Sequence, residues 1–116
     1  MKKIIILLSC VVVLIIACSK SNDTAAVSMV DCSGAAKSFS TDVNPIIQSS
    51  CATNSGCHAA GSNNGPGALT SYPQIFNARS AIRTAVANGS MPQNSSLSAA
   101  QKNAIICWID NGATNN

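Results

Sequence analysis

The segment from Cys51 to His58, CATNSGCH, gathers the residue types of this chain that are best suited to chemistry. It holds two of the six cysteines and the single histidine, and Cys57 directly precedes His58. Cysteine thiols can add across the two vinyl groups of a haem, and a histidine beside the second cysteine then ligates the iron. Two residues usually separate such cysteines, whereas five separate them here. The segment therefore indicates haem attachment through Cys51, Cys57 and His58, or through Cys57 alone.

A haem that carries electrons usually has a second axial ligand, and the choice in this chain is small. With one histidine, a second imidazole from the same chain is impossible, so the three methionines are the candidates. Met1 belongs to the leader and Met29 to a polar segment without periodicity. Met91 lies downstream of His58 and precedes Pro92, which lacks an amide donor and stiffens its loop. Met91 is the predicted distal ligand, and the alternative is an ordinary packing methionine.

The N-terminal segment has the features of a targeting signal. Two lysines precede an apolar run over residues 4–16, and Ala17 and Cys18 follow it. This pattern predicts a signal peptide over residues 1–17, with Cys18 as the lipid-modified first residue of the mature protein. The alternative, an uncleaved membrane helix, is disfavoured because the run is short for a full span.

The composition of the remaining chain excludes some functions. Of the seven Lys and Arg residues two lie in the leader, so five face four Asp residues, and no basic stripe suggests nucleic acid. Two Phe, one Tyr and one Trp provide a thin core for a domain of this size. Such a domain usually needs a staple or a cofactor, and a buried haem would supply apolar volume.

Residues 18–38 are small and polar and predict a tether, followed by one folded domain over residues 39–116. We expect a first helix with a cap at Ser40 or Thr41, Pro45 in its opening turn, and an end near Ser50.

A Gly- and Asn-rich stretch over residues 59–69 predicts a loop before a second helix. That helix has a cap at Ser71, an expected break near residues 77–80, and an end at Asn88–Gly89. Ser98 caps a third helix whose apolar residues form one broad face. No segment alternates with period two, so the predicted class is all-α.

The order of these features resembles a mono-haem cytochrome c domain over about residues 39–113. The block MPQNSSLSAAQKNAIICWIDNGA looks like the methionine loop and C-terminal helix of that family. The resemblance implies a small helical domain wrapped around one covalently attached haem c. Cys51 and Cys57 would carry the thioethers, with His58 as proximal and Met91 as distal ligand.

The resemblance also implies that Trp108 and Ile109 pack where the terminal helix crosses the first. It leaves Cys32 and Cys107 without a role at the haem. A disulfide between them is expected in an exported protein, and a free buried thiol at Cys107 is the alternative.

The expected function is electron transfer rather than independent catalysis, because a six-coordinate iron has no open position. The alternative is a haem-free, extracytoplasmic binding lipoprotein stapled by Cys51–Cys57 and Cys32–Cys107. A metal site of Cys51, Cys57 and His58 is a third hypothesis, weakened by the lack of a fourth ligand nearby. The expected protein is a monomer anchored by its lipid, in the outer membrane because Ser19 gives no retention signal. Its partners would be redox proteins of the cell envelope.

Overall fold

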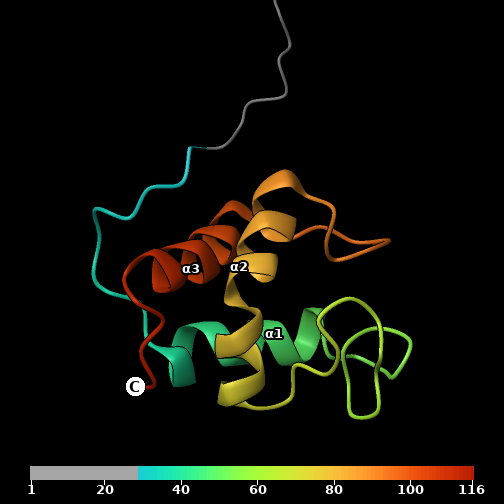
Figure 1. Cartoon of the computed structure of the whole chain (residues 1–116). Coiled ribbons are helices and arrows are strands. Elements are labelled where there is room, and N and C mark those ends of the chain that lie inside the picture. Colours follow the sequence, from blue (N-terminus) through green and yellow to red (C-terminus); the bar gives the residue numbers. More distant parts are fainter. Residues whose placement is uncertain (1–28) are drawn as a thin grey trace, which may run out of the picture.

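The computed structural model describes residues 29–116, and over this range the chain is helical without strands, so the all-α prediction is confirmed (Figure 1). The elements are η1 (Phe39–Val43), α1 (Asn44–Ser50), α2 (Tyr72–Asn88) and α3 (Ala99–Asp110). The predicted leader, Cys18 and the first part of the predicted tether lie outside the described residues. Within those residues no helix is long and apolar enough to cross a membrane.

The first helix begins earlier than predicted. Ser38, rather than Ser40 or Thr41, is its N-cap residue, and the Ser38 amide donates to the Asp42 carboxylate over 2.7 Å. The helix opens with the wide π turn of η1 and continues directly into α1. Pro45 lies at the junction, where a residue without an amide donor breaks the regular ladder.

The chain's last residue explains this early start. The Ser40 amide donates to the Asn116 carbonyl and the Phe39 amide to the Asn116 side-chain oxygen, both over 2.9 Å. The first amides of a helix lack partners within it, and Asn116 supplies them here. A contact across the whole domain therefore replaces the local cap expected from sequence.

The second helix is continuous, so the predicted break near residues 77–80 is wrong. Ile75, Ala78, Ile82 and Val86 are buried at helical spacing, and Ala78 carries this face through the expected break. No glycine or proline interrupts residues 77–80, so nothing there opposes the helix. Gly89, with φ of 74°, ends the helix as predicted.

The third helix also follows its sequence signals. The Ser98 hydroxyl accepts from the Gln101 amide, and the Gln101 side chain accepts from the Ser98 amide over 2.9 Å, which forms a capping box. Residues 104–108 are buried and Ile109 is partly buried. The apolar face predicted for this helix is therefore its packing face.

Four aromatic rings join η1, α2 and α3. Phe39 lies 5.0 Å from Tyr72 and 5.5 Å from Trp108 between ring centroids, and Phe76 lies 5.6 Å from Tyr72. Trp108 is fully buried against η1. The last helix thus crosses the first at Trp108, and aromatic pairs of this kind add stability beyond the area they bury.

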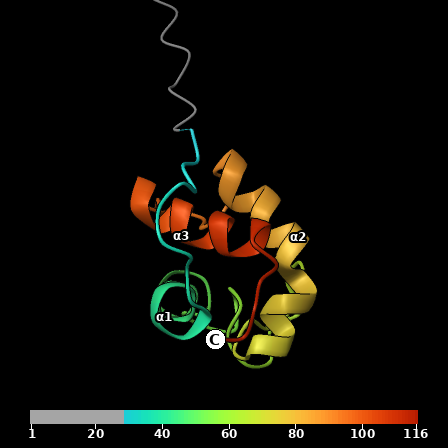
Figure 2. The same ribbon diagram turned by 90° about the vertical axis from the view of Figure 1, so that its left-hand side faces the viewer.

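The predicted disulfide partners, Cys32 and Cys107, lie at disulfide distance with their Cα atoms 5.4 Å apart. The segment before η1 passes along α3 on its way to the first helix (Figure 2). The bond fixes this irregular segment to a helix that is 75 residues further along the chain.

Changing Cys32 to Ser should lower the free energy of unfolding by about 2–5 kcal/mol, because the unfolded chain regains the freedom of a long closed loop. Urea denaturation followed by Trp108 fluorescence measures the effect. Met29→Ala is the control, since Met29 lies in the same segment with 87% of its surface exposed. An unchanged urea midpoint for Cys32→Ser would contradict the expectation.

Candidate functional site

A cavity of about 600 Å³ brings together the four residues that the sequence assigns to a haem: Cys51, Cys57, His58 and Met91. It lies between the end of α1 with the loop that follows and the loop from α2 to α3. Both loops project from the same end of the helices (Figure 1). Residues separated by more than thirty positions in sequence thus line one space.

The segment CATNSGCH folds back on itself. The His58 amide donates to the Cys51 carbonyl over 3.0 Å, which brings the two ends of the segment together. The Cys57 amide donates to both the backbone and the side-chain oxygen of Asn54, over 3.0 and 3.1 Å. The additional residues between the cysteines therefore form a turn organised by Asn54. A Cβ on Gly56 would lie only 3.0 Å from the Asn54 side-chain oxygen, so this turn favours glycine there.

The loop after His58 closes over the same segment. The Leu69 amide donates to the His58 carbonyl over 2.8 Å, and the Asn64 side chain donates to the Gly56 carbonyl over 2.7 Å. The buried Ser62 hydroxyl donates to the Cys57 carbonyl. These bonds fix the backbone of the Cys57–His58 pair.

His58 has a defined orientation. Only 8% of its surface is exposed, and its Nδ1 lies 2.9 Å from the Gly67 carbonyl oxygen. A carbonyl only accepts hydrogen bonds, so Nδ1 carries the hydrogen and Nε2 of the neutral ring retains its lone pair. Metal-ligating histidines are commonly oriented in this way, by donation of the other ring nitrogen to a backbone carbonyl. His58 is therefore arranged to act as a ligand through Nε2.

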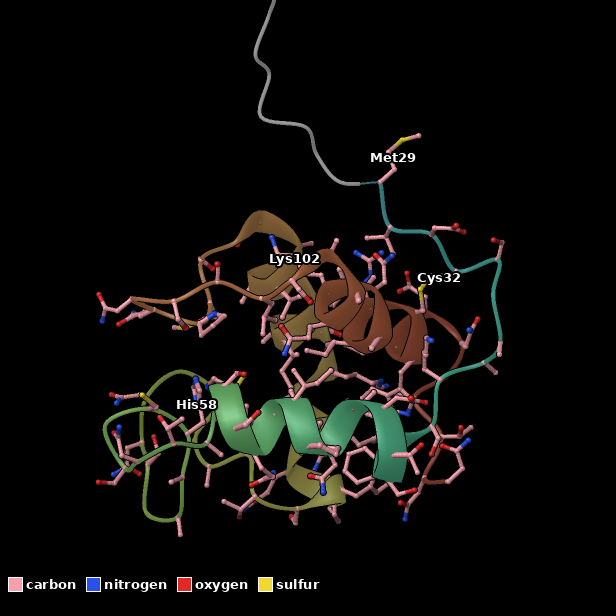
Figure 3. All side chains as sticks on the ribbon, turned by 180° about the vertical axis from the view of Figure 1, so that it is seen from behind. Met29, Cys32, His58 and Lys102 are labelled. Atoms are coloured by element: carbon pink, nitrogen blue, oxygen red, sulfur yellow. A yellow bond between two sulfur atoms is a disulfide. The ribbon has the colours of Figure 1, made fainter. Side chains whose placement is uncertain are left out.

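Met91 reaches the cavity from the opposite loop. Its amide donates to the Ala85 carbonyl of α2 over 3.3 Å, so the loop starts from a fixed point on that helix. Pro92 follows, and the buried Leu97 returns the chain to the core. The Met91 side chain is half-buried, whereas Met29 lies far from the cavity and is exposed (Figure 3).

Cys51 and Cys57 are both free thiols and both half-buried. Burial raises the pKa of the Cys51 thiol, and the nearby Cys57 raises it further. Cys51 is thus held as a thiol rather than a thiolate at neutral pH. The Cys51 thiol becomes reactive when a base removes its proton or when the pH is higher, because the thiolate is the nucleophile.

The donor set of the cavity differs from that expected for a bare metal ion. Among residues 29–116 no group of three His, Cys, Asp or Glu side chains is placed to hold a metal ion, which disfavours the predicted Cys51, Cys57 and His58 metal site. An imidazole with a free Nε2, a thioether and two free thiols face one space of a size typical for ligand pockets.

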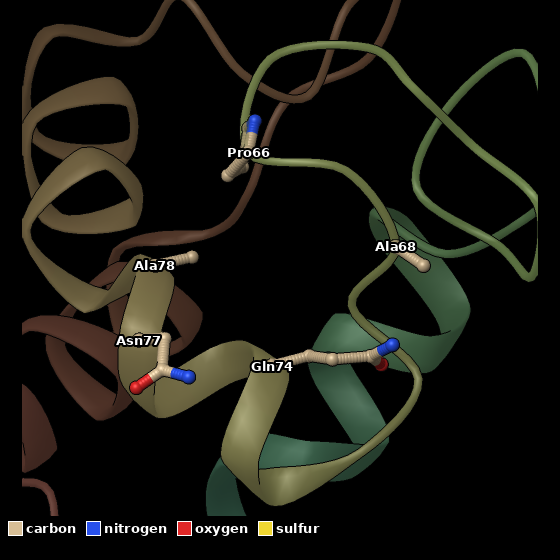
Figure 4. A pocket seen from close by; sticks show the side chains of 5 residues that line it. All are labelled: Pro66, Ala68, Gln74, Asn77 and Ala78. Carbon is tan, nitrogen blue, oxygen red and sulfur yellow. The ribbon is translucent and has the colours of Figure 1, made fainter.

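A second cavity, of about 450 Å³, lies between the Gly-rich loop and the start of α2 (Figure 4). Its lining residues are Pro66, Ala68, Gln74, Asn77 and Ala78. None of them is titratable, and the Gln74 side-chain oxygen already accepts from the amide and hydroxyl of Thr70. This cavity offers no ligand set comparable with the first.

Sequence reasoning missed the residues that position the site. Asn54 and Ser62 act through side-chain hydrogen bonds to the backbone of Cys57, and Gly67 acts through its own carbonyl; the sequence indicated only that they lie in loops. The density of Asn and Gly was the one available signal. Comparison with family models, curated proteins and solved structures gives no match to this chain.

The raised pKa of Cys51 predicts slow alkylation. In protein purified without haem, iodoacetamide at pH 8 should modify Cys51 more slowly in the native state than in urea, because less thiolate is present. The native rate should rise as the pH rises towards the higher pKa. Peptide mapping by mass spectrometry after timed quenching measures the rate at Cys51. Equal rates in the native and unfolded protein would contradict this expectation.

Proposed function

We propose that this protein is a mono-haem, c-type electron carrier in which His58 and Met91 ligate the iron and Cys51 and Cys57 attach the haem. The observation that carries the proposal is the single cavity lined by all four side chains, with His58 held through Nδ1. The helical elements would then wrap the haem at the end of the fold where the two loops meet.

Each residue has a distinct task in this proposal. The thiols of Cys51 and Cys57 add across vinyl groups, and each addition forms a carbon–sulfur bond and moves the thiol hydrogen to the neighbouring carbon, so no oxidant is consumed. His58 offers Nε2 while the Gly67 carbonyl holds the ring. Met91 offers a soft, neutral sulfur, and a His/Met pair favours a comparatively high reduction potential. When bound, haem supplies an iron that alternates between the ferric and ferrous states.

The alternative is a haem-free binding lipoprotein stapled by two disulfides. It requires a Cys51–Cys57 bond as well as the Cys32–Cys107 bond. Cys32 and Cys107 lie at disulfide distance, but Cys51 and Cys57 are free thiols. The carrier uses both free thiols, whereas the alternative gives His58 and Met91 no function, so the carrier explains more of the site.

The cellular setting forms part of the proposal. Cys18 would carry the lipid, residues 18–38 would connect it to the domain, and the monomeric domain would exchange electrons with redox proteins of the cell envelope. We favour the outer membrane, and we assign no role to nucleic acid.

Covalent attachment is tested by acid–acetone extraction followed by a pyridine haemochrome spectrum and an intact mass. The haem should stay with the protein, and Cys57→Ala should abolish this retention. Cys51→Ala tests the five-residue spacing, because a haem retained by one thioether would show that Cys57 suffices. Ser50→Ala, beside Cys51, is the control and should retain two thioethers. Haem extracted from the unaltered protein would exclude covalent attachment.

Replacement of Met91 by Ala tests the axial pair. The variant should lose the weak sulfur-to-iron absorption band, bind carbon monoxide in its ferrous form, and show a lower reduction potential, because a neutral thioether favours ferrous iron. Optical spectra and potentiometric titration measure these changes. Met29→Ala is the matched control and should change none of them. An unaltered spectrum and potential for Met91→Ala would show that Met91 only packs.

A further inference from the structure

We propose that the mouth of the site cavity is a docking face without protein charge, and that it receives a redox partner whose own docking face is uncharged. This inference rests on the proposed function and adds the chemistry of the partner. Among the described residues that line the cavity, none is Asp, Glu, Lys or Arg. The rim consists instead of hydroxyl, amide and glycine residues, including Thr53, Gly56, Gln93 and Ser96.

Three side-chain carboxylates belong to the described residues: Asp31, Asp42 and Asp110. Asp31 precedes Cys32, which lies far from His58 (Figure 3), and its carbonyl is 3.5 Å from the Cys107 Sγ, six positions or about 9 Å along α3 from Gln101. Asp42 is in η1, and Ser50 at the cavity is eight positions further along the chain, which corresponds to a rise of about 12 Å along a helix. Asp110 ends α3, whereas Gln101 lines the cavity near the start of that helix, about 13 Å away along the axis. All these separations exceed the Debye length of about 8 Å at physiological salt.

None of the described Lys and Arg side chains lines the mouth either. Arg83 pairs with Asp110 through two hydrogen bonds of 2.6 and 2.8 Å. Arg79 stacks on the Phe76 ring at 4.0 Å and donates to the Phe76 carbonyl. Lys102 follows Gln101 but lies on the opposite side of the Met91 loop from His58 (Figure 3). Lys37 precedes the start of η1.

This distribution determines what kind of partner fits. A charged patch placed against the mouth would lose water without gaining an opposite charge, and that desolvation is costly. Charge complementarity mainly accelerates encounter and excludes wrong partners, and this rim supplies none. Recognition by the protein rim therefore depends on shape and on neutral hydrogen bonds, and the rim side chains should add little salt dependence to association.

The local potential can be measured on the haem-free protein with three soluble nitroxides, one cationic, one neutral and one anionic. At each of the backbone amides of Gly56, Gln93 and Ser96, the three nitroxides should cause nearly equal paramagnetic relaxation. Gln93→Lys should then favour the anionic probe near these amides, by about twofold at roughly 10 Å and low salt. Asn115→Lys, an exposed position at the other end of the fold, is the matched control and should leave the rim amides unchanged.

In the haem-loaded protein, electron exchange is measured with an anionic and a cationic iron complex between about 0.01 and 0.15 M ionic strength. Lys102→Gln should leave the salt dependence of both rates unchanged, whereas Gln93→Lys should change it in opposite directions for the two complexes. Two results would overturn the uncharged mouth. One is that the unaltered protein enriches one charged nitroxide at the rim amides as strongly as Gln93→Lys does. The other is that Lys102→Gln weakens the salt dependence of the electron-exchange rates. Absence of covalent haem would instead overturn the proposed function, and with it the redox partner.

Discussion

The packing of Phe39, Tyr72, Phe76 and Trp108 is the constraint on which the rest of the fold depends. These rings lie where η1, α2 and the second half of α3 meet, and they concentrate the aromatic area at one end of the helices. The Tyr72 hydroxyl donates to the Ala113 carbonyl over 2.8 Å, which draws the C-terminal residues over the same cluster. With the aromatic area collected there, the loops at the other end have no large ring to pack against.

The loop end is organised mainly by hydrogen bonds. The turns around His58 depend on hydrogen bonds with the backbone of Cys51 and Gly67, the backbone and side chain of Asn54, and the hydroxyl of Ser62. A cavity between such loops exposes groups that a bound apolar ring system would cover, and the added burial would stabilise the folded state. The few aromatic residues inferred from composition therefore stabilise one end of the fold, and hydrogen bonds stabilise the loops at the other end.

The sequence predicts those parts of the fold that depend on neighbours in the chain. The capping box at Ser98 and the stop at Gly89 are local signals, and both are confirmed. The start of the first helix depends on Asn116, which is far away in sequence, so a local cap was the wrong expectation. The predicted break in α2 gave too little weight to Ala78, whose small side chain continues the buried face.

The site shows the same division between local and distant information. Its donor atoms follow from residue types, so Cys51, Cys57, His58 and Met91 could be named from the sequence. Their convergence depends on a loop that follows α2 and starts from the Ala85 carbonyl, which no spacing rule reveals.

The five-residue spacing between the cysteines illustrates how sequence distance and spatial distance can differ. The additional residues form a turn in which Asn54 accepts two bonds from the Cys57 amide, and the Cys51 carbonyl accepts one from the His58 amide. The turn therefore absorbs the extra length, and both cysteines still line the cavity that His58 faces. A longer gap is compatible with a shared site whenever the inserted residues satisfy their own polar groups. In this chain Asn54 and Gly56 meet that condition, so the five-residue spacing by itself does not place Cys51 away from Cys57 and His58.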